Sequence, residues 1–123
     1  MDTSDYEVFL KTHPGRGKLR VQVTEARGAF PVPGALVEVR RRFGGESRLL
    51  YKVLTDSSGI VENLVLPTLP AELSRQEATA DSGGTAYLVA VSHPAFRTPA
   101  ETAVMLYDGI ETILPVALQP LAR

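Results

Sequence analysis

The sequence predicts an all-β protein: a seven-stranded antiparallel Greek-key β-sandwich with one short N-terminal helix. Three observations favour this fold class. Seven short segments alternate apolar and polar residues with a period of two, which is the pattern of half-buried strands. Turn residues separate these segments about every ten residues, as they do in sandwiches. The chain has 123 residues, 44% of them hydrophobic, which is enough for one hydrophobic core.

The helix is expected from Ser4 to Thr12. Ser4 and Glu7 have the spacing of a capping box, in which two side chains satisfy backbone N–H groups of the first turn. Pro14 and the glycines after it should end the helix. A helix this short is marginal in water, so we expect it either to dock or to fray. Docking could be on its own sandwich or in a partner's groove. Its apolar side is formed by Tyr6, Phe9 and Leu10.

The first two strands are expected over residues 18–24 and 35–43. Between them, residues 30–34 hold two prolines, which cannot donate to a ladder, and should form a turn. The run Arg40-Arg41-Arg42 is expected to be a solvated strand end. The inward side chains of the two strands are Leu19, Val21, Val23, Val37, Val39 and Phe43.

The third and fourth strands are expected over residues 48–55 and 60–66. A hairpin turn at Gly44 and Gly45 precedes the third strand. The segment Asp56-Ser57-Ser58-Gly59 separates the two strands, because an aspartate accepts backbone N–H bonds and a glycine adopts a positive φ. Pro67 should close the fourth strand.

The last three strands are expected over residues 87–92, 102–107 and 112–118. The final two should form a hairpin around Asp108 and Gly109. Residues 67–84 are longer than an ordinary connection, and loops of that length are commonly functional. The chain then divides into an N-terminal helical extension (1–16), a sandwich domain (17–119) and a tail (120–123).

The composition excludes several classes of function. The 13 basic and 14 acidic residues give a net charge of −1, so the chain has no basic excess to hold nucleic-acid phosphates. The absence of cysteine excludes disulfides, thiolate catalysis and cysteine-ligated metals. No apolar stretch has the length of a membrane span, and the polar N-terminus is unlike a secretory signal. We expect no membrane insertion and a cytoplasmic location.

Three segments occur in an order that resembles a known family. They are residues 17–23, the Pro-Gly-Ala turn and strand of residues 31–39, and Thr55-Asp56-Ser57-Ser58-Gly59. In this order the chain is similar to the carboxypeptidase regulatory-like domain, a transthyretin-like (prealbumin-like) sandwich, over residues 17–119. One departure is His93-Pro94-Ala95-Phe96, where that family usually carries a small-Gly-aromatic element.

A narrower likeness involves both ends of the chain. Tyr6-Glu7-x-Phe9-Leu10, Tyr107-Asp108-Gly109-Ile110 and Leu114-Pro115-Val116 are similar to modules that accompany spore cortex-lytic proteins of spore-forming bacteria. Both resemblances imply a non-catalytic accessory domain that supports folding, docking or surface attachment of a partner. A spore-associated location is then the alternative to a plain cytoplasmic one.

No catalytic, cofactor-binding or metal site is expected. The motifs of nucleophile elbows, phosphate loops and dinucleotide sites are missing. His13 and His93 both precede proline, which favours turns, and a metal site made from them with Asp108 is the alternative. Transthyretin-like folds include 5-hydroxyisourate hydrolases, and an enzyme of this type is a further alternative, although the Tyr-Arg-Gly-Ser tail of that family is absent. Related adhesins join a lysine to an asparagine, and Lys18 has no such partner in the last strand.

The function that remains is interaction with another molecule. We expect the chain to be a structural or protein-binding module that is accessory to a bacterial cell-envelope or spore cortex system. We expect a protein partner, with a homodimer through the sandwich edges left open. The alternative is a sandwich that binds a small molecule or a cell-wall glycan. The candidate contact residues are Tyr6, Phe9 and Leu10 on the helix, Glu72 and Arg75 in the long connection, and Tyr107 and Asp108 at the last turn.

Overall fold

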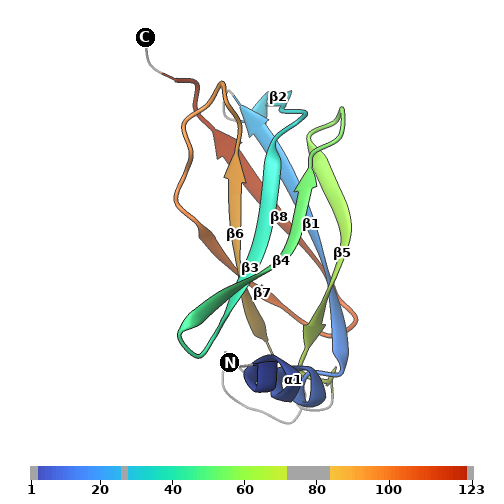
Figure 1. Ribbon diagram of the computed structural model, residues 1–123. Helices are drawn as coiled ribbons and strands as arrows, with labels where there is room; N and C mark the ends of the chain where they lie inside the picture. The colour runs from blue at the N-terminus through green and yellow to red at the C-terminus, as the bar shows by residue number, and fades with distance from the viewer. Residues whose placement is uncertain (1–2, 26–27, 72–83, 122–123) are drawn as a thin grey trace.

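A computed structural model describes residues 3–25, 28–71 and 84–121, without the side chains of Thr3 and Ser4. It confirms an all-β sandwich with one short helix (Figure 1). The elements are α1 (Thr3–Thr12), β1 (Gly15–Glu25), β2 (Phe30–Pro31), β3 (Leu36–Phe43), β4 (Glu46–Leu54), β5 (Ile60–Thr68), β6 (Thr85–Ser92), β7 (Thr102–Leu106) and β8 (Glu111–Leu118). The helix is therefore one residue longer than predicted at its start.

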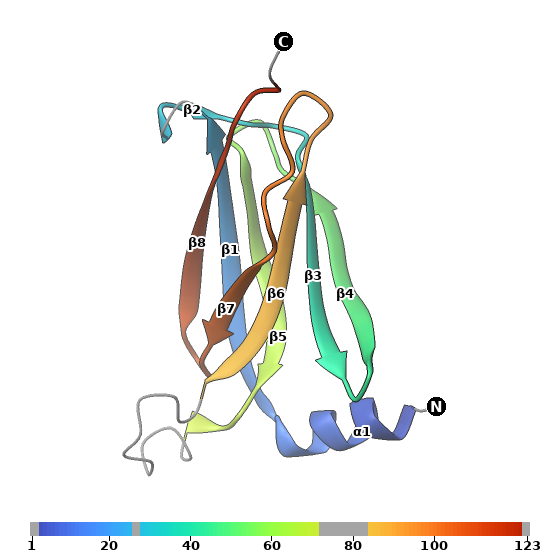
Figure 2. The same cartoon turned by 90° about the vertical axis from the view of Figure 1, so that its left-hand side faces the viewer.

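The strands form two sheets. Sheet A contains β1, β2, β5 and β8, and sheet B has the order β4-β3-β6-β7. Helix α1 lies across one end of the sandwich, and the chain ends beyond the opposite end (Figures 1 and 2). No helix in the described ranges combines the length and the apolar character that crossing a membrane requires.

The predicted alternation places the core correctly. Leu19, Val21 and Val23 on β1 are fully buried, while the residues between them reach the surface. Val37 and Val39 on β3 are likewise fully buried and face them from sheet B. Burial of apolar side chains from both sheets is the main favourable term in the stability of such a sandwich.

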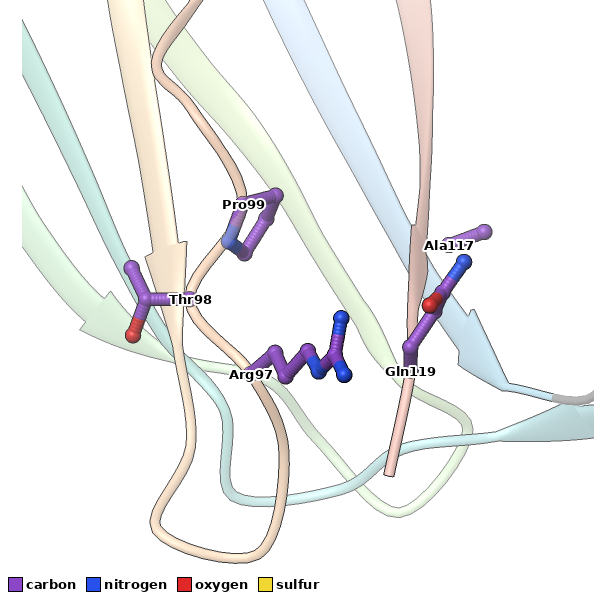
Figure 3. Close-up of a pocket in the computed structure, with 5 residues that line it drawn as sticks. All are labelled: Arg97, Thr98, Pro99, Ala117 and Gln119. Carbon is purple, nitrogen blue, oxygen red and sulfur yellow. The ribbon is translucent and has the colours of Figure 1, made fainter. Parts of the chain in front are cut away.

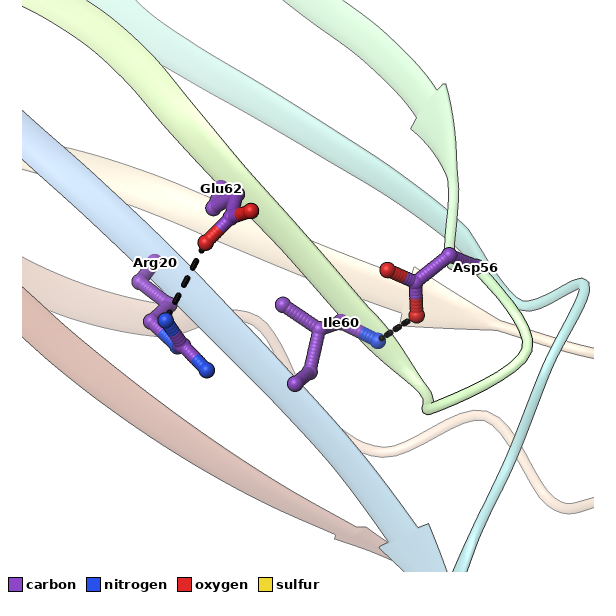
Figure 4. Close-up of polar contacts among 4 residues, drawn as sticks. All are labelled: Arg20, Asp56, Ile60 and Glu62. Atoms are coloured by element: carbon purple, nitrogen blue, oxygen red, sulfur yellow. Dashed lines mark hydrogen bonds and ion pairs between the residues drawn. The ribbon is translucent and has the colours of Figure 1, made fainter.

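The turn predicted at residues 56–59 is confirmed in detail (Figure 4). The Oδ1 atom of Asp56 accepts hydrogen bonds from the backbone N–H of Ser58 (2.8 Å) and of Ile60 (3.0 Å). Gly59 has a φ of 75°, and a Cβ there would lie 2.5 Å from the carbonyl oxygen of Val23. A glycine is thus required at this position for both its conformation and its space.

The last predicted hairpin is wrong. β7 pairs with β6 in sheet B, whereas β8 pairs with β1 in sheet A and runs parallel to it. The Asp108–Gly109 turn therefore crosses between the sheets. Backbone bonds from Gly109 N–H to the Arg16 carbonyl (2.9 Å) and from Lys18 N–H to the Ile110 carbonyl (3.0 Å) hold it against β1. One strand pair is consequently parallel in a sandwich predicted to be antiparallel throughout.

Two predicted proline boundaries also differ. Phe30–Pro31, predicted as part of a turn, forms the short strand β2 against the end of β1. The strand predicted to stop before Pro67 continues to Thr68, with Pro67 opposite Arg16. Both prolines lie on strands at the edge of sheet A, where a missing N–H removes no ladder bond. β1 itself begins at Gly15, two residues before the predicted sandwich boundary.

Candidate functional site

Helix α1 docks on the sandwich of its own chain. Phe9 is only 6% exposed, and its ring lies 5.1 Å from the ring of Phe43 at the end of β3. Tyr6 meets the same ring edge-on, with 5.3 Å between centroids. Two of the predicted contact residues, Tyr6 and Phe9, therefore pack within the molecule. Leu10, the third residue of the predicted apolar side, is 40% exposed.

Arg41 is the polar centre of this junction. Its guanidinium carbon lies 4.6 Å from the centroid of the Phe9 ring and 5.7 Å from that of Tyr87. The prediction of a solvated cluster at residues 40–42 is therefore wrong for Arg41. The period-two pattern explains the difference, because Arg41 falls in phase with the inward residues Val39 and Phe43.

His13 closes the helix side of the junction. Its ring stacks on Phe9 at 4.0 Å, and Nδ1 lies 2.9 Å from the Phe9 carbonyl oxygen and 2.8 Å from Oγ1 of Thr12. Burial lowers the pKa of His13, the bond to the Phe9 carbonyl opposes that shift, and the positive charge of Arg41 lowers the pKa further. The histidine therefore tends to be neutral where it packs on the aromatic ring.

Asp108 joins three segments at the same end of the sandwich. Its carboxylate accepts hydrogen bonds from the backbone N–H of Arg16 (2.9 Å) and of Ala71 (3.0 Å). These bonds favour the charged form and lower the pKa of Asp108. The residue that was predicted as a contact therefore fixes the turn, the start of β1 and the start of the long connection. Tyr107 beside it is half-buried.

The outer face of sheet B is more apolar than a solvated sheet face normally is. Its side chains alternate with buried core residues along β3, β6 and β7, so they point away from the sandwich. On β4 the outward residues are those paired with the outward residues of β3. Leu54 is 61% exposed and Leu49 is 40% exposed. The apolar residues of this outer face are Leu36, Leu49, Leu54, Ala86, Leu88, Ala90, Ala103 and Met105.

The outer face carries four charged side chains. Arg40 and Glu38 pair with each other at 3.5 Å. Lys52 and Arg42 are exposed, and neither lies within ion-pair distance of a carboxylate among the described residues. The uncompensated charge on this face is thus positive.

Two hollows lie beside the connection between β6 and β7. One, of about 310 Å³, is lined by Arg97, Thr98, Pro99, Ala117 and Gln119. Figure 3 shows the Arg97 side chain reaching from this connection toward the end of β8. The other hollow, of about 510 Å³, extends from the outer face of sheet B and is lined by Gly34, Leu36, Leu54, Ser92, His93, Pro94 and Thr98. Small-molecule sites usually have volumes of about 300–1,000 Å³.

The structure separates the groups of the alternative metal site. His13 lies at the end of α1, whereas His93 follows β6 at the opposite end of the sandwich (Figure 1). Within the described ranges, no three histidine, aspartate or glutamate side chains lie where they could hold a metal ion together. The Lys18 side chain is exposed on β1, with Glu111 opposite it on β8.

The predicted contact residues thus fall into separate places. The helix residues and Asp108 lie at one end of the sandwich, and Glu72 and Arg75 lie outside the described residues. The outer face of sheet B was not predicted from the sequence, because only the inward residues of each alternating strand indicate the core. The leucines at the outward positions 36, 54 and 88 were the available signal.

No protein family and no curated protein matches the sequence. Solved structures do match the fold. The Bacillus anthracis TIE protein has a TM-score of 0.60 at 15% identity, with 87% of this chain and 17% of that chain covered. GBS52, the minor pilin of Streptococcus agalactiae, has a TM-score of 0.55 at 16% identity, with 89% of this chain and 46% of that chain covered. Transthyretin from Sparus aurata has a TM-score of 0.57 at 18% identity, with 85% of this chain and 90% of that chain covered.

Catechol 1,2-dioxygenases also contain a matching domain, at identities of 12–14%. The chain spans less than half of the TIE protein and of the pilin, but nearly the whole of transthyretin. At these identities the matches establish architecture and not activity. The protein has the transthyretin-like β-sandwich fold.

Proposed function

We propose that the chain is a non-catalytic structural and protein-interaction module that binds a protein partner through the outer face of sheet B. The apolar surface of that face carries the proposal. An antiparallel sheet facing water normally presents polar side chains, and a contiguous apolar surface marks a contact site in many proteins. Here leucines from three adjacent strands lie on one face, on either side of a row that contains Glu38 and Lys52.

The charges on the face specify the partner's chemistry. Lys52 lies between the leucines of β4, Arg42 lies near the helix end of β3, and neither has a carboxylate partner among the described residues. A complementary partner presents apolar side chains bordered by aspartate or glutamate. The setting that we propose is a bacterial cell-envelope or spore cortex system, where the module resembles the carboxypeptidase regulatory-like accessory domains. The fold's occurrence in a minor pilin of a Gram-positive pathogen supports an envelope setting.

Site-specific photo-crosslinking in growing and sporulating native cells tests this function. A photoreactive amino acid at position 54 samples the outer face of sheet B, and one at position 113 samples β8 in sheet A. The two native residues are comparably exposed, at 61% and 53%. We expect one protein to be crosslinked from position 54 and not from position 113.

Binding by the purified partner completes the test. Leu54→Asp should weaken it by about tenfold or more, because it places a charge in an apolar contact, and Ile113→Asp should leave it unchanged. Equal crosslinking from both positions would contradict the proposed face. Hydrolysis of an ester, amide or ureide by the purified protein at an enzyme-like rate would contradict a non-catalytic role.

A second function is favoured by the hollow between Arg97 and Gln119 (Figure 3). A guanidinium, an amide and a hydroxyl group there suit a small polar molecule or a cell-wall glycan. A ligand that binds only the folded state raises the unfolding temperature. Thermal unfolding with cell-wall fragments therefore tests this alternative, with Arg97→Ala as the variant that should abolish any shift. An unchanged unfolding temperature across the fragments would rule it out.

A further inference from the structure

Strands β3 and β6 separate as they approach the helix end of the sandwich (Figure 2). Their last ladder pair is Arg40 with Leu88. One residue further along β3, the Arg41 side chain donates a hydrogen bond to the carbonyl oxygen of Ala86. The guanidinium thus contacts the β6 backbone just beyond the point where the ladder between β3 and β6 ends.

A cavity of about 210 Å³ opens at this separation. It is lined by Arg41, Arg42, Ala86, Tyr87 and Leu88. Arg42 and Ala86 are exposed at its edge, whereas Tyr87 is only 1% exposed and forms its inner wall. The cavity therefore connects the surface of sheet B with the aromatic junction beneath α1.

The charge at the inner end of the cavity has no carboxylate partner in the part of the chain that the structure describes. Nε of Arg41 is buried and has no hydrogen-bond partner among the described residues. Arg20 also has a buried Nε without a partner, but its guanidinium pairs with Glu62 at 3.1 Å. No described carboxylate lies within 4.0 Å of Arg41. Aromatic rings offset part of the cost of removing a cation from water, but they leave its hydrogen-bonding capacity unused.

We propose that this cavity is a binding site for a carboxylate group, held by Arg41 and Arg42. A guanidinium donates N–H bonds in the geometry of the two carboxylate oxygens, and since Nε of Arg41 is buried, the bonds from Arg41 would come from its terminal amino groups. Ala86 and Leu88 provide apolar walls for the methylene group behind the carboxylate. A phosphate dianion would bring a second charge and a third oxygen to the same apolar walls. The proposal does not depend on the proposed function, because it follows from the cavity and from Arg41, which has no carboxylate partner among the described residues.

Nuclear magnetic resonance of the whole ¹⁵N-labelled chain tests the site. Acetate is titrated at constant ionic strength against chloride. We expect saturable shifts of the Arg41 Nε–Hε signal and of the Ala86 and Leu88 amides, with a dissociation constant on the order of 1–10 mM for so small a ligand. Shifts that chloride reproduces, or no shift of the Arg41 signal, would overturn the proposal.

Peptide-like probes identify the source of the carboxylate. N-acetylglycine carries a terminal carboxylate, N-acetylaspartic acid α-amide carries a side-chain carboxylate, and N-acetylglycinamide carries neither. We expect at least one of the first two probes to shift the Arg41 signal. The probe that binds more tightly indicates whether the site takes a terminal or a side-chain carboxylate. Equal binding of the uncharged amide, or tighter binding of inorganic phosphate than of acetate, would contradict a carboxylate site.

Two neighbouring arginines provide a matched pair of variants. Arg42→Gln should weaken acetate binding by roughly fivefold, the loss expected for one charge-assisted hydrogen bond near the surface. Arg40→Gln removes the same charge from the same strand, but Arg40 pairs with Glu38 and does not line the cavity. It should leave the dissociation constant unchanged, and equal effects of the two substitutions would contradict the site. Since Arg41 supports the docking of α1, it is followed through its own signal and is not replaced.

Discussion

The phenolic hydroxyl of Tyr87 on β6 donates a hydrogen bond to the carbonyl oxygen of Pro67 on β5. A second tyrosine makes a similar connection, from Tyr51 on β4 to the carbonyl of Val65 (2.9 Å). Both acceptors lie on an edge strand of sheet A, and both donors belong to sheet B. The two sheets are therefore joined by polar bonds as well as by their apolar core. The bonds also satisfy carbonyl groups that an edge strand would otherwise leave without a partner.

Tyr87→Phe should destabilise the protein by about 1–2 kcal/mol, because it removes the donor and leaves the Pro67 carbonyl without its bond. The measurement is urea unfolding at neutral pH. Tyr107→Phe is the control, since no hydrogen bond of its hydroxyl occurs among the described residues, and a change within about 0.5 kcal/mol is expected. Equal effects of the two substitutions would show that the bond between the sheets contributes nothing.

Phe9→Ala should lower the free energy of unfolding by about 3 kcal/mol, the usual cost of deleting a buried aromatic side chain. Val8→Ala changes the next residue of α1, which is 58% exposed, and should have an effect within about 0.5 kcal/mol. Proteolysis after Lys11 measures release of the helix. Cleavage after Lys11 should be faster than in the native chain for Phe9→Ala and unchanged for Val8→Ala. Unchanged cleavage would mean that Phe9 does not hold α1 in place.

Gly15→Ala should destabilise the fold by about 1–3 kcal/mol, as overpacking does. A Cβ at Gly15 would lie 2.6 Å from Oγ1 of Thr68 and 2.8 Å from Cγ of Asp108. Gly45→Ala is a matched control, because a Cβ there meets no atom within 4 Å and the backbone is not in the left-handed region. Thermal unfolding should show a lower midpoint for the first variant and an unchanged or slightly higher one for the second. The reverse order would disprove the close approach at Gly15.

Asp108→Ala should destabilise the protein in a pH-dependent way. The N–H groups of Arg16 and Ala71 lower the pKa of Asp108, so the folded state favours the charged carboxylate. This stabilisation is complete above the unfolded-state pKa of about 3.9 and is lost as the pH falls through the lower pKa of the folded protein. The difference in urea midpoint between the native chain and the variant should be constant at neutral pH and shrink below about pH 4.

The control for Asp108 is Glu111→Gln, which changes an exposed carboxyl group just after the same turn. It should leave the urea midpoint at neutral pH nearly unchanged. A difference for Asp108→Ala that persisted undiminished through the acid range would show that the carboxylate charge has no part in holding the turn.

Local patterns predicted most of the strands because those patterns have local causes. Leu19, Val21 and Val23 face the core by simple alternation, and Asp56 with Gly59 contains the whole chemistry of its turn. The Asp108–Gly109 turn is different. Its residues show that the chain reverses, but the choice between β7 and β1 as the neighbour of β8 depends on contacts with Arg16 and Lys18, more than ninety residues earlier.

The candidate sites were less predictable than the fold. Arg41 is a charged residue, and charged residues are normally predicted to lie at the surface. Only its position in the alternation between Val39 and Phe43 indicates that its side chain points inward. The docking of α1 depends on that phase, because Phe43 provides the ring against which Tyr6 and Phe9 pack. The cavity at Ala86 depends on where two strands separate, which no short segment of sequence encodes.

The parallel pairing of β1 with β8 also determines how the domain bears mechanical tension. Eight residue pairs, from Lys18 with Glu111 to Glu25 with Leu118, join the first long strand to the last. β1 begins at the helix end of the sandwich and β8 finishes at the opposite end (Figure 1). A force that pulls those two points apart acts along both strands and loads their hydrogen bonds together, in shear. A hairpin pulled at its open end would lose the same bonds one at a time, at a much lower force.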